Sequence, residues 1–224
     1  MRYRLRTQLL VIAKAPVPGR SKTRLCPPCT PEEAALLAEA ALRDTLDAVL
    51  ATPAARRVLV LDGTPGPWLP DGFDIIDQRG GGLDERLAAA FDDAGAPAVL
   101  IGMDTPQVSP HLLTGAIARL ERPRANAVLG LADDGGWWAI GLRRADPAAF
   151  LGVPMSTSHT GTAQLTRLRA LGLDVGMLPQ LRDVDRIDDA EAVAAQVPGS
   201  RFAAALACLA GPIHAGAEPL KTAG

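Results

Sequence analysis

The chain has 224 residues, of which 48% are hydrophobic and 21% are charged, and its formal net charge at pH 7 is −2. This composition is typical of a globular domain and excludes a disordered chain. The charge argues against a nucleic-acid binder or a membrane-surface protein, because neither polyanion would be attracted to the molecule as a whole. The length fits one domain, which we expect over residues 1–210, followed by a flexible tail over residues 211–224.

Targeting signals and cysteine usage are consistent with a cytoplasmic protein. The first apolar run, Leu9–Ala13, is too short for a signal peptide, and Lys14 interrupts it. The three cysteines, Cys26, Cys29 and Cys208, cannot all pair, and a single Cys-Pro-Pro-Cys lacks the second ligand pair of a structural zinc site. A redox role for this motif stays open, but reduced loop thiols in a reducing compartment are the favoured interpretation.

Apolar strand-like runs alternate along the chain with alanine- and leucine-rich helical segments. This alternation predicts an α/β fold, a mostly parallel central sheet with helices on both faces. Thr30 can cap the first helix, because Pro31 suits a first turn and Glu33 stands three residues after the cap. The expected strands are residues 9–13, 58–62, 74–77, 98–101, 127–131, 137–142 and 175–178, and the expected helices are 31–50, 83–94, 109–120, 162–171, 188–196 and 200–209. Strands 127–131 and 137–142 are separated only by ADDGG, which leaves no room for a crossover helix.

The first strand leads into a basic loop. VIAKAPVPGRSKTRL places Lys14, Arg20, Lys22 and Arg24 around prolines and a glycine. A chain reversal needs the proline and the glycine but not the charge. Backbone amides and cations together could hold a polyphosphate, although neither the Walker spacing nor a Rossmann fingerprint is present. On charge alone, a solvated basic loop is an equally good interpretation.

A carboxylate follows a central apolar strand in VLIGMDTP, where Asp104 stands at the expected carboxyl end. Ligands bind at this edge of a parallel α/β sheet. A carboxylate there is a suitable ligand for Mg²⁺ or Mn²⁺, which takes one or two carboxylates with phosphate and water oxygens. The alternative is a helix cap, for which Ser109 is better placed.

A second acidic motif lies in LRDVDRIDD, where Asp183 and Asp185 alternate about Val184. In an extended segment this spacing points both carboxylates to the same side, as a metal site requires. The alternative is a solvated turn in which Asp188 or Asp189 caps the next helix. The motif is weak alone and gains weight beside the carboxylate after the central strand.

Four motifs in order resemble the bacterial rSAM/selenodomain-associated glycosyltransferases of the nucleotide-diphospho-sugar transferase superfamily. They are VIAKAPVPGRSKTRL, GMDTP, LADDGGWWAIGL and LRDVDRIDDAEAV. The resemblance runs from about Leu9 to Val193. KTRL and the Asp-Val-Asp are also similar to 2-phospho-L-lactate guanylyltransferase, and the fold more remotely resembles molybdenum cofactor guanylyltransferase. The resemblance implies a single-domain, Rossmann-like GT-A fold.

The resemblance also implies roles for individual residues. GGGLDERLAAAF looks like the family's Gly-x-Leu-Gly-x-Arg segment, with Asp84 where glycine is usual, and DVDRIDD lacks the usual Thr-Pro. Catalysis would involve Lys22 and Asp104. The metal, Mg²⁺ or Mn²⁺, would be held by Asp104, Asp183 and Asp185. Nucleotide binding would fall to Lys14, Gly19, Arg20, Lys22, Arg24, Gly82 and Arg86, and acceptor binding to Asp133, Asp134, Gly135, Gly136, Trp137, Ser158 and His159.

Two of these acceptor residues have strong alternatives. Strand alternation makes Trp137 and Trp138 face opposite sides, so that one of them packs in the core. A lone histidine such as His159 is more often a cap or a structural hydrogen-bonding group than a base.

The same residues suit two reactions. In nucleotidyl transfer, a phosphate or phosphonate of the acceptor attacks an NTP, and pyrophosphate leaves. In glycosyl transfer, an acceptor hydroxyl attacks the sugar of an NDP-sugar. The basic loop favours nucleotidyl transfer, whereas the family's customary label favours glycosyl transfer. A nucleotide-binding module without catalysis is the third alternative, and the sequence leaves open whether the chain forms a homodimer.

Overall fold

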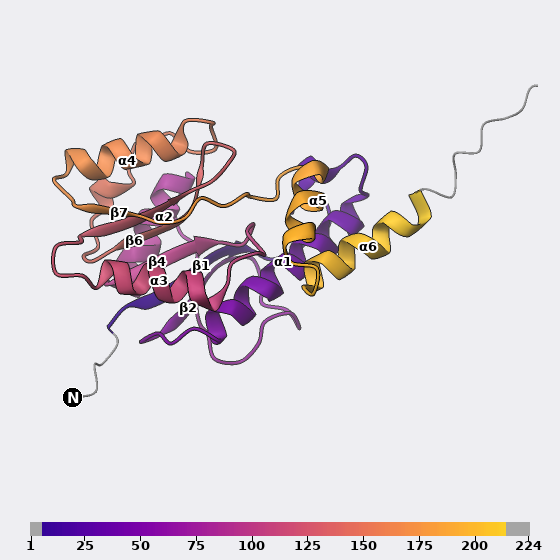
Figure 1. Ribbon diagram of the computed structural model, residues 1–224, viewed down its shortest axis with the longest axis horizontal. Helices are drawn as coiled ribbons and strands as arrows, with labels where there is room; N and C mark the ends of the chain where they lie inside the picture. The colour runs from indigo at the N-terminus through magenta and orange to yellow at the C-terminus, as the bar shows by residue number, and fades with distance from the viewer. Residues whose placement is uncertain (1–5, 214–224) are drawn as a thin grey trace, which may run out of the picture.

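The computed structural model describes residues 6–213, which form a seven-stranded sheet with helices on both faces (Figure 1). The strand order is β3-β2-β1-β4-β6-β5-β7. Every strand except β6 runs in the same direction, which confirms the predicted α/β fold. The strands are β1 (Gln8–Lys14), β2 (Arg57–Asp62), β3 (Asp74–Asp77), β4 (Ala98–Gly102), β5 (Ala127–Leu131), β6 (Trp137–Leu142) and β7 (Val175–Met177).

The helices follow the predicted order. They are α1 (Pro31–Leu50), α2 (Leu83–Ala94), α3 (Pro110–Leu120), α4 (Thr160–Ala170), α5 (Ile187–Gln196) and α6 (Arg201–Ile213), with the short 3₁₀ turns η1 (Thr23–Leu25) and η2 (Pro147–Ala149). Thr30 caps α1 as predicted: its hydroxyl accepts the Glu33 N–H at 3.2 Å, and its own N–H donates to Glu33 Oε2 at 2.7 Å. Helix α6 extends past the predicted end, so residues 211–213 are helical, while the remainder of the predicted tail lies outside the described residues.

Alternate residues of the strands pack into two cores, one on each face of the sheet. On one face, Leu9 and Val11 of β1 pack with residues of α1 and α3. On the other face, Leu10 packs with residues of α2, η2 and α4. This alternation is the period-2 pattern that a strand imposes, and the apolar runs of the sequence satisfy it on both faces.

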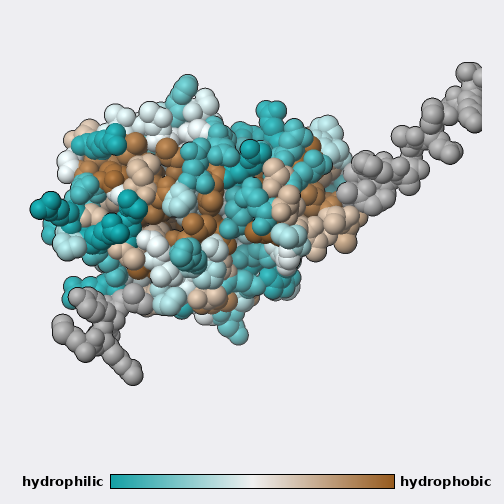
Figure 2. All heavy atoms as spheres, viewed as in Figure 1, coloured by the Kyte–Doolittle hydropathy of each residue, from teal (hydrophilic) through white to brown (hydrophobic). Residues whose placement is uncertain are grey.

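A third apolar cluster lies beyond the sheet, where α5 and α6 lie beside α1 (Figure 1). Leu25 of the basic loop and Val184 of the acidic motif are both fully buried in it. Figure 2 shows hydrophilic residues between the body of the sheet and the α5–α6 unit, along the connection that leads from β7 to α5. The cluster therefore anchors two loops that are far apart in the sequence.

The carboxyl ends of the parallel strands meet at one edge of the sheet. The connections reverse direction between the adjacent strands β1 and β4, which is the topological switch point where α/β sheets bind ligands. Because β6 is antiparallel, its first residue, Trp137, also lies at this edge, and β5 and β6 form a hairpin. Among the described residues, no helix is long and apolar enough to cross a membrane.

Candidate active site

A cleft of about 860 Å³ opens at this edge of the sheet. Its walls come from the basic loop after β1, the glycine run after β3, the end of β4, the β5–β6 turn, residues 155–160 and the segment before α5. Most of the predicted site residues line it: Lys14, Arg20, Lys22, Arg24, Arg86, Asp104, Asp134, Gly136, Trp137, Ser158, Asp183 and Asp185. Gly19, Gly82, Asp133, Gly135 and His159 do not.

Lys22 lies between the two acidic motifs. Its side chain is only 8% exposed, and its Nζ lies 2.7 Å from Asp104 Oδ1. The same ammonium group donates to the backbone carbonyl of Val184. The backbone N–H of Val184 in turn donates to the backbone carbonyl of Asp104 at 2.9 Å. Lys22 has a left-handed backbone, with φ of 51°, which is uncommon for a residue with a side chain. The loop, the end of β4 and the acidic segment are therefore held together around one buried cation.

The other cations of the loop differ in how they are engaged. Arg24 forms an exposed ion pair with Asp185, with 2.5 Å between Nη1 and Oδ2. Within residues 6–213, Lys14 and Arg20 line the cleft without an ion pair. The loop thus presents two cations that carboxylates already neutralise and two that are free to bind an anion.

Asp183 carries the largest electrostatic perturbation in the cleft. Burial and, to a smaller extent, the nearby carboxylates of Asp104 and Asp134 together raise the pKa of its carboxyl to about 8, although Lys22 opposes the shift. Its Oδ1 is buried and has no hydrogen-bond partner. A buried acceptor without a donor is a group that a cation, water or ligand would satisfy. Val184, between Asp183 and Asp185, points into the third apolar cluster, as the predicted alternation requires.

Asp133 and Asp134 of the β5–β6 turn, both predicted to bind the acceptor, lie in different surroundings. Asp133 accepts hydrogen bonds from Gln180 at 3.0 Å and Arg182 at 3.3 Å, and does not line the cleft. Asp134 does line it, and its Oδ1 accepts the Gly136 N–H at 2.7 Å. The structure thus engages Asp133 in contacts with residues 180 and 182, outside the cleft, and the acceptor-binding role expected for it stays a prediction.

Gly135 also has a structural role rather than a lining role. Its φ is +90°, and a Cβ at this position would lie 2.0 Å from the carbonyl oxygen of Ser158. Its own carbonyl accepts the Gly161 N–H at 2.8 Å. Only glycine permits this close approach, which seats the turn against the start of α4.

The two tryptophans face opposite sides, as predicted. Trp138 is buried in the core with α1 and α3, and its indole N–H donates to the Pro179 carbonyl at 2.9 Å. Both tryptophans are among the residues that line the cleft, but Trp138 is only 1% exposed, whereas Trp137 is half-buried and its Nε1–H has no partner. Trp137 is therefore the tryptophan that can contact a ligand.

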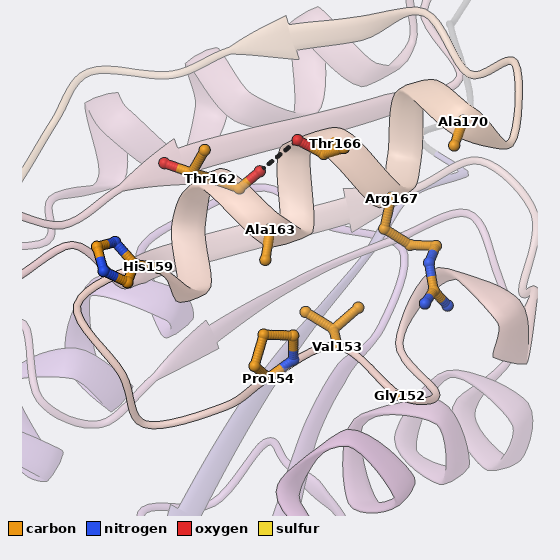
Figure 3. A pocket seen from close by; sticks show the side chains of 9 residues that line it. All are labelled: Gly152, Val153, Pro154, His159, Thr162, Ala163, Thr166, Arg167 and Ala170. Carbon is orange, nitrogen blue, oxygen red and sulfur yellow. Dashed lines mark hydrogen bonds between the residues drawn. The ribbon is translucent and has the colours of Figure 1, made fainter.

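His159 lies at the start of α4 in a separate groove of about 480 Å³, shown in Figure 3 with Pro154, Thr162 and Arg167. Its side chain makes no capping hydrogen bond. The predicted acceptor role for His159 thus lacks geometric support, because the side chain is outside the main cleft.

Helix α2, which follows the glycine run after β3, contributes Arg86, which lines the cleft and pairs with Asp62 at 3.2 Å. Asp84, which replaces the family's usual glycine, accepts the Gly152 N–H at 3.0 Å. That hydrogen bond lowers the pKa of the Asp84 carboxyl. The departure from the family pattern therefore links α2 to the loop that leads to α4.

Several residues that line the cleft were not predicted. They are Gln78, Gly81, Thr105, Ser156, Thr157, Thr160, Arg186 and Asp189. The signal for Gln78 was its position directly after a strand, and its amide donates to the Ala13 and Val60 carbonyls. Ser156 has a left-handed backbone, with φ of 58°, which nothing in its local sequence indicates.

The cysteines are all free thiols. Burial, together with the nearby Glu33 and Cys26, raises the pKa of the Cys29 thiol. A buried thiol with a raised pKa is a poor nucleophile, which supports the interpretation of Cys26 and Cys29 as reduced loop thiols.

The family model DUF2064, described as an uncharacterized protein conserved in bacteria, matches residues 36–157, which is more than half of the chain. The chain belongs to this family. The matched residues run from α1 to the loop before α4 and therefore include Asp104 and the β5–β6 turn. No curated protein matches the chain.

Solved structures place the fold among nucleotidyl and glycosyl transferases of the GT-A type. The chain is similar to a Desulfovibrio desulfuricans G20 protein provisionally named a nucleotide-diphospho-sugar transferase, with 27% identity, a TM-score of 0.79, and coverage of 91% of this chain and 94% of that one. CMP:2-keto-3-deoxy-manno-octonic acid synthetase, solved with CTP, shares the fold at 11% identity and a TM-score of 0.54, with coverage of 86% and 98%. Glucosyl-3-phosphoglycerate synthase from Mycobacterium tuberculosis, solved with Mn²⁺ and UDP, shares it at 12% identity and a TM-score of 0.53, with coverage of 92% and 81%.

Proposed function

We propose that this protein is a metal-dependent transferase that moves a nucleotidyl group from an NTP to a small acceptor. The observation that carries the proposal is the arrangement of charges at the switch point. The cations of the basic loop and the carboxylates of Asp104 and Asp183 line the same cleft side by side, with Lys22 paired to Asp104. A polyphosphate with a divalent ion complements both groups at once.

The carboxylates fit such an ion only in part. Within the described residues, no three His, Cys, Asp or Glu side chains are gathered closely enough to form a complete metal site. Asp183, with its unpartnered Oδ1, and Asp104 would hold Mg²⁺ or Mn²⁺, and Asp185 would join once Arg24 released it. The remaining ligands would be phosphate and water oxygens, which is the usual coordination of Mg²⁺. When bound, the ion neutralises phosphate charge.

The cations of the loop would bind the phosphates. Lys14 and Arg20 are free to do so in this structure, while Lys22 and Arg24 would exchange their aspartates for phosphate oxygens. Arg20 and Arg24 can grip a phosphate bidentately, whereas a lysine acts as a point charge. Four cations suit a triphosphate and its departing pyrophosphate better than a diphosphate, which is why we favour nucleotidyl transfer.

Glycosyl transfer from an NDP-sugar is the second candidate. It is supported by the provisional name of the Desulfovibrio relative, at 27% identity, and by the resemblance to the rSAM/selenodomain-associated family. The resemblance to 2-phospho-L-lactate guanylyltransferase makes GTP the first nucleotide to test. A cytoplasmic location and a homodimer stay predictions.

Calorimetric titration with GTP, ATP, CTP, UTP and UDP-glucose, each with and without Mg²⁺, tests the proposal. We expect an NTP to bind more tightly than UDP-glucose and only with the metal. Lys14→Met and Arg20→Met should each weaken NTP binding about tenfold, because a charge-assisted contact contributes about 1.5 kcal/mol. Both residues lie at the edge of the cleft, so that the fold should tolerate their replacement.

Arg144→Met is the matched control, because Arg144 is exposed and does not line the cleft. Equal losses in the control and in the two loop variants would remove the loop from phosphate binding. Tighter binding of UDP-glucose than of any NTP would select glycosyl transfer. Tight nucleotide binding without turnover in any acceptor mixture would support the module without catalysis.

A further inference from the structure

The wall of the cleft opposite the basic loop has its own chemistry. It is formed by the β5–β6 turn and the segment that enters α4, and we call it the acceptor wall: Asp134, Gly136, Trp137, Met155, Ser156, Thr157, Ser158 and Thr160. It presents hydroxyls, one carboxylate, an indole and a thioether. None of its residues is a lysine or an arginine, and His159, which stands between Ser158 and Thr160 in the sequence, lines the other groove.

The N-terminus of α4 would ordinarily offer an anion site, because its first amides have no helical partner. Here those amides are already bonded within the protein. The Thr157 N–H donates to Thr160 Oγ1 at 3.1 Å, and the His159 N–H donates to Thr157 Oγ1 at 3.2 Å. The Thr160 N–H donates to the Thr157 carbonyl and the Gly161 N–H to the Gly135 carbonyl. A phosphate at this wall would therefore meet no lysine or arginine of the wall itself, and four of the nearby amides are already engaged.

The charges around the acceptor wall also disfavour an anion. Asp134 of the wall lines the same cleft as the carboxylates of Asp104 and Asp183. The cations of the cleft come from the basic loop, from Arg86 on α2 and from Arg186 before α5, not from this wall. A negatively charged acceptor would be repelled from the wall, and its charge would be drawn to the donor side.

Trp137 and Met155 give the wall an apolar surface beside its hydroxyls. The indole lines the cleft and has an unpartnered N–H, and Ser158 and Thr157 are exposed. Sugars and polyols present the complementary pattern, C–H faces that pack on an aromatic ring and hydroxyls that both donate and accept. Asp134 can accept from a hydroxyl through its carboxylate.

We propose that the acceptor is an uncharged polyhydroxyl compound, a sugar or a polyol, that packs on Trp137 and hydrogen-bonds to Asp134 and to the exposed hydroxyls of Ser156 and Ser158. This departs from the phosphate or phosphonate acceptor that the sequence favoured. The proposal rests on the proposed transferase function but does not depend on which group is transferred, because a hydroxyl can accept either one.

Pairs of probes that differ by a single phosphate test the charge preference. Saturation-transfer NMR would measure binding of D-glucose, D-galactose, D-mannose, myo-inositol and glycerol, and of their monophosphates, in the presence of Mg²⁺ and the tightest-binding nucleotide. We expect at least one neutral probe to bind more tightly than its phosphate. Trp137→Leu should lower that binding at least tenfold.

Ser158→Lys is the complementary variant, because Ser158 is exposed and the change places a cation on the wall. It should raise the affinity for the phosphate probes about tenfold. Tighter binding of the phosphates by the wild-type protein, or no binding of any neutral probe, would overturn the proposal. Nucleotide binding, recorded in the same samples, separates these outcomes from a failure of the transferase function itself.

Discussion

Replacement of Asp183 by asparagine should remove a loss of stability that the metal-free wild-type protein suffers as the pH rises. The pKa of Asp183 is about 8 in the folded state, against an ordinary value of 3.8. Between these values the folded protein holds a proton that the unfolded chain has lost, so that stability falls as pH rises through this window. Each unit of pKa difference corresponds to 1.36 kcal/mol. Between pH 6 and pH 8 the wild-type protein should therefore lose about 2 kcal/mol that the variant keeps.

Thermal unfolding in the presence of a chelator measures this difference. About 2 kcal/mol corresponds to roughly 4–8 °C for a domain of this size. We expect the melting temperature of Asp183→Asn, relative to wild type, to rise by that amount between pH 6 and pH 8. Asp71→Asn, a replacement of an exposed carboxylate outside the cleft, should show no such rise. A difference between Asp183→Asn and wild type that is independent of pH would refute the reasoning.

Three further predictions concern individual contacts. Gly135→Ala should destabilise the protein by at least about 2 kcal/mol in urea unfolding, because φ is +90° and the added Cβ would meet the Ser158 carbonyl. Gly115→Ala is the control: it lies in an exposed turn of α3 with open space around it, and should stabilise the protein by up to about 1 kcal/mol. Asp104→Asn should abolish metal-dependent nucleotide binding in calorimetry without unfolding the protein, and unchanged binding would exclude Asp104 as a ligand. Arg24→Lys should weaken nucleotide binding several-fold, since the bidentate grip is lost; an unchanged affinity would show that Arg24 only pairs with Asp185.

The sequence predicted the sheet well because five of its seven strands, β1, β2, β4, β5 and β6, are largely buried. The side chains of an apolar run such as Leu9–Ala13 leave water only if the run is a strand covered on both faces. The order of such runs and of the helical segments along the chain then indicates which helix connects which strands. The ends of the helices were harder to predict than the strands. Helix α4 begins two residues before its predicted start, because the Gly161 N–H is satisfied by the Gly135 carbonyl of a distant turn. Such a long-range cap leaves no trace in the local sequence.

In the candidate site, too, some features follow from the local sequence and others depend on distant contacts. Its edge of the sheet could be predicted, since Asp104 follows a central strand and the alternation about Val184 points its neighbours into the cleft. Which of Asp133 and Asp134 lines the cleft could not be predicted. That choice depends on the irregular pairing at Gly130/Leu131 and on partners at positions 180 and 182.

The resting pairs of the cleft imply that metal and nucleotide assist each other in binding. Lys22 is engaged by Asp104, and Arg24 by Asp185, so that a nucleotide alone meets cations that are already neutralised. A metal alone must compete with the same cations for the carboxylates. When both ligands enter together, each cation exchanges a carboxylate for a phosphate and each carboxylate exchanges a cation for the metal, so that no charge is left unpaired. Thermodynamic linkage then requires the metal to tighten nucleotide binding by the same factor as the nucleotide tightens metal binding.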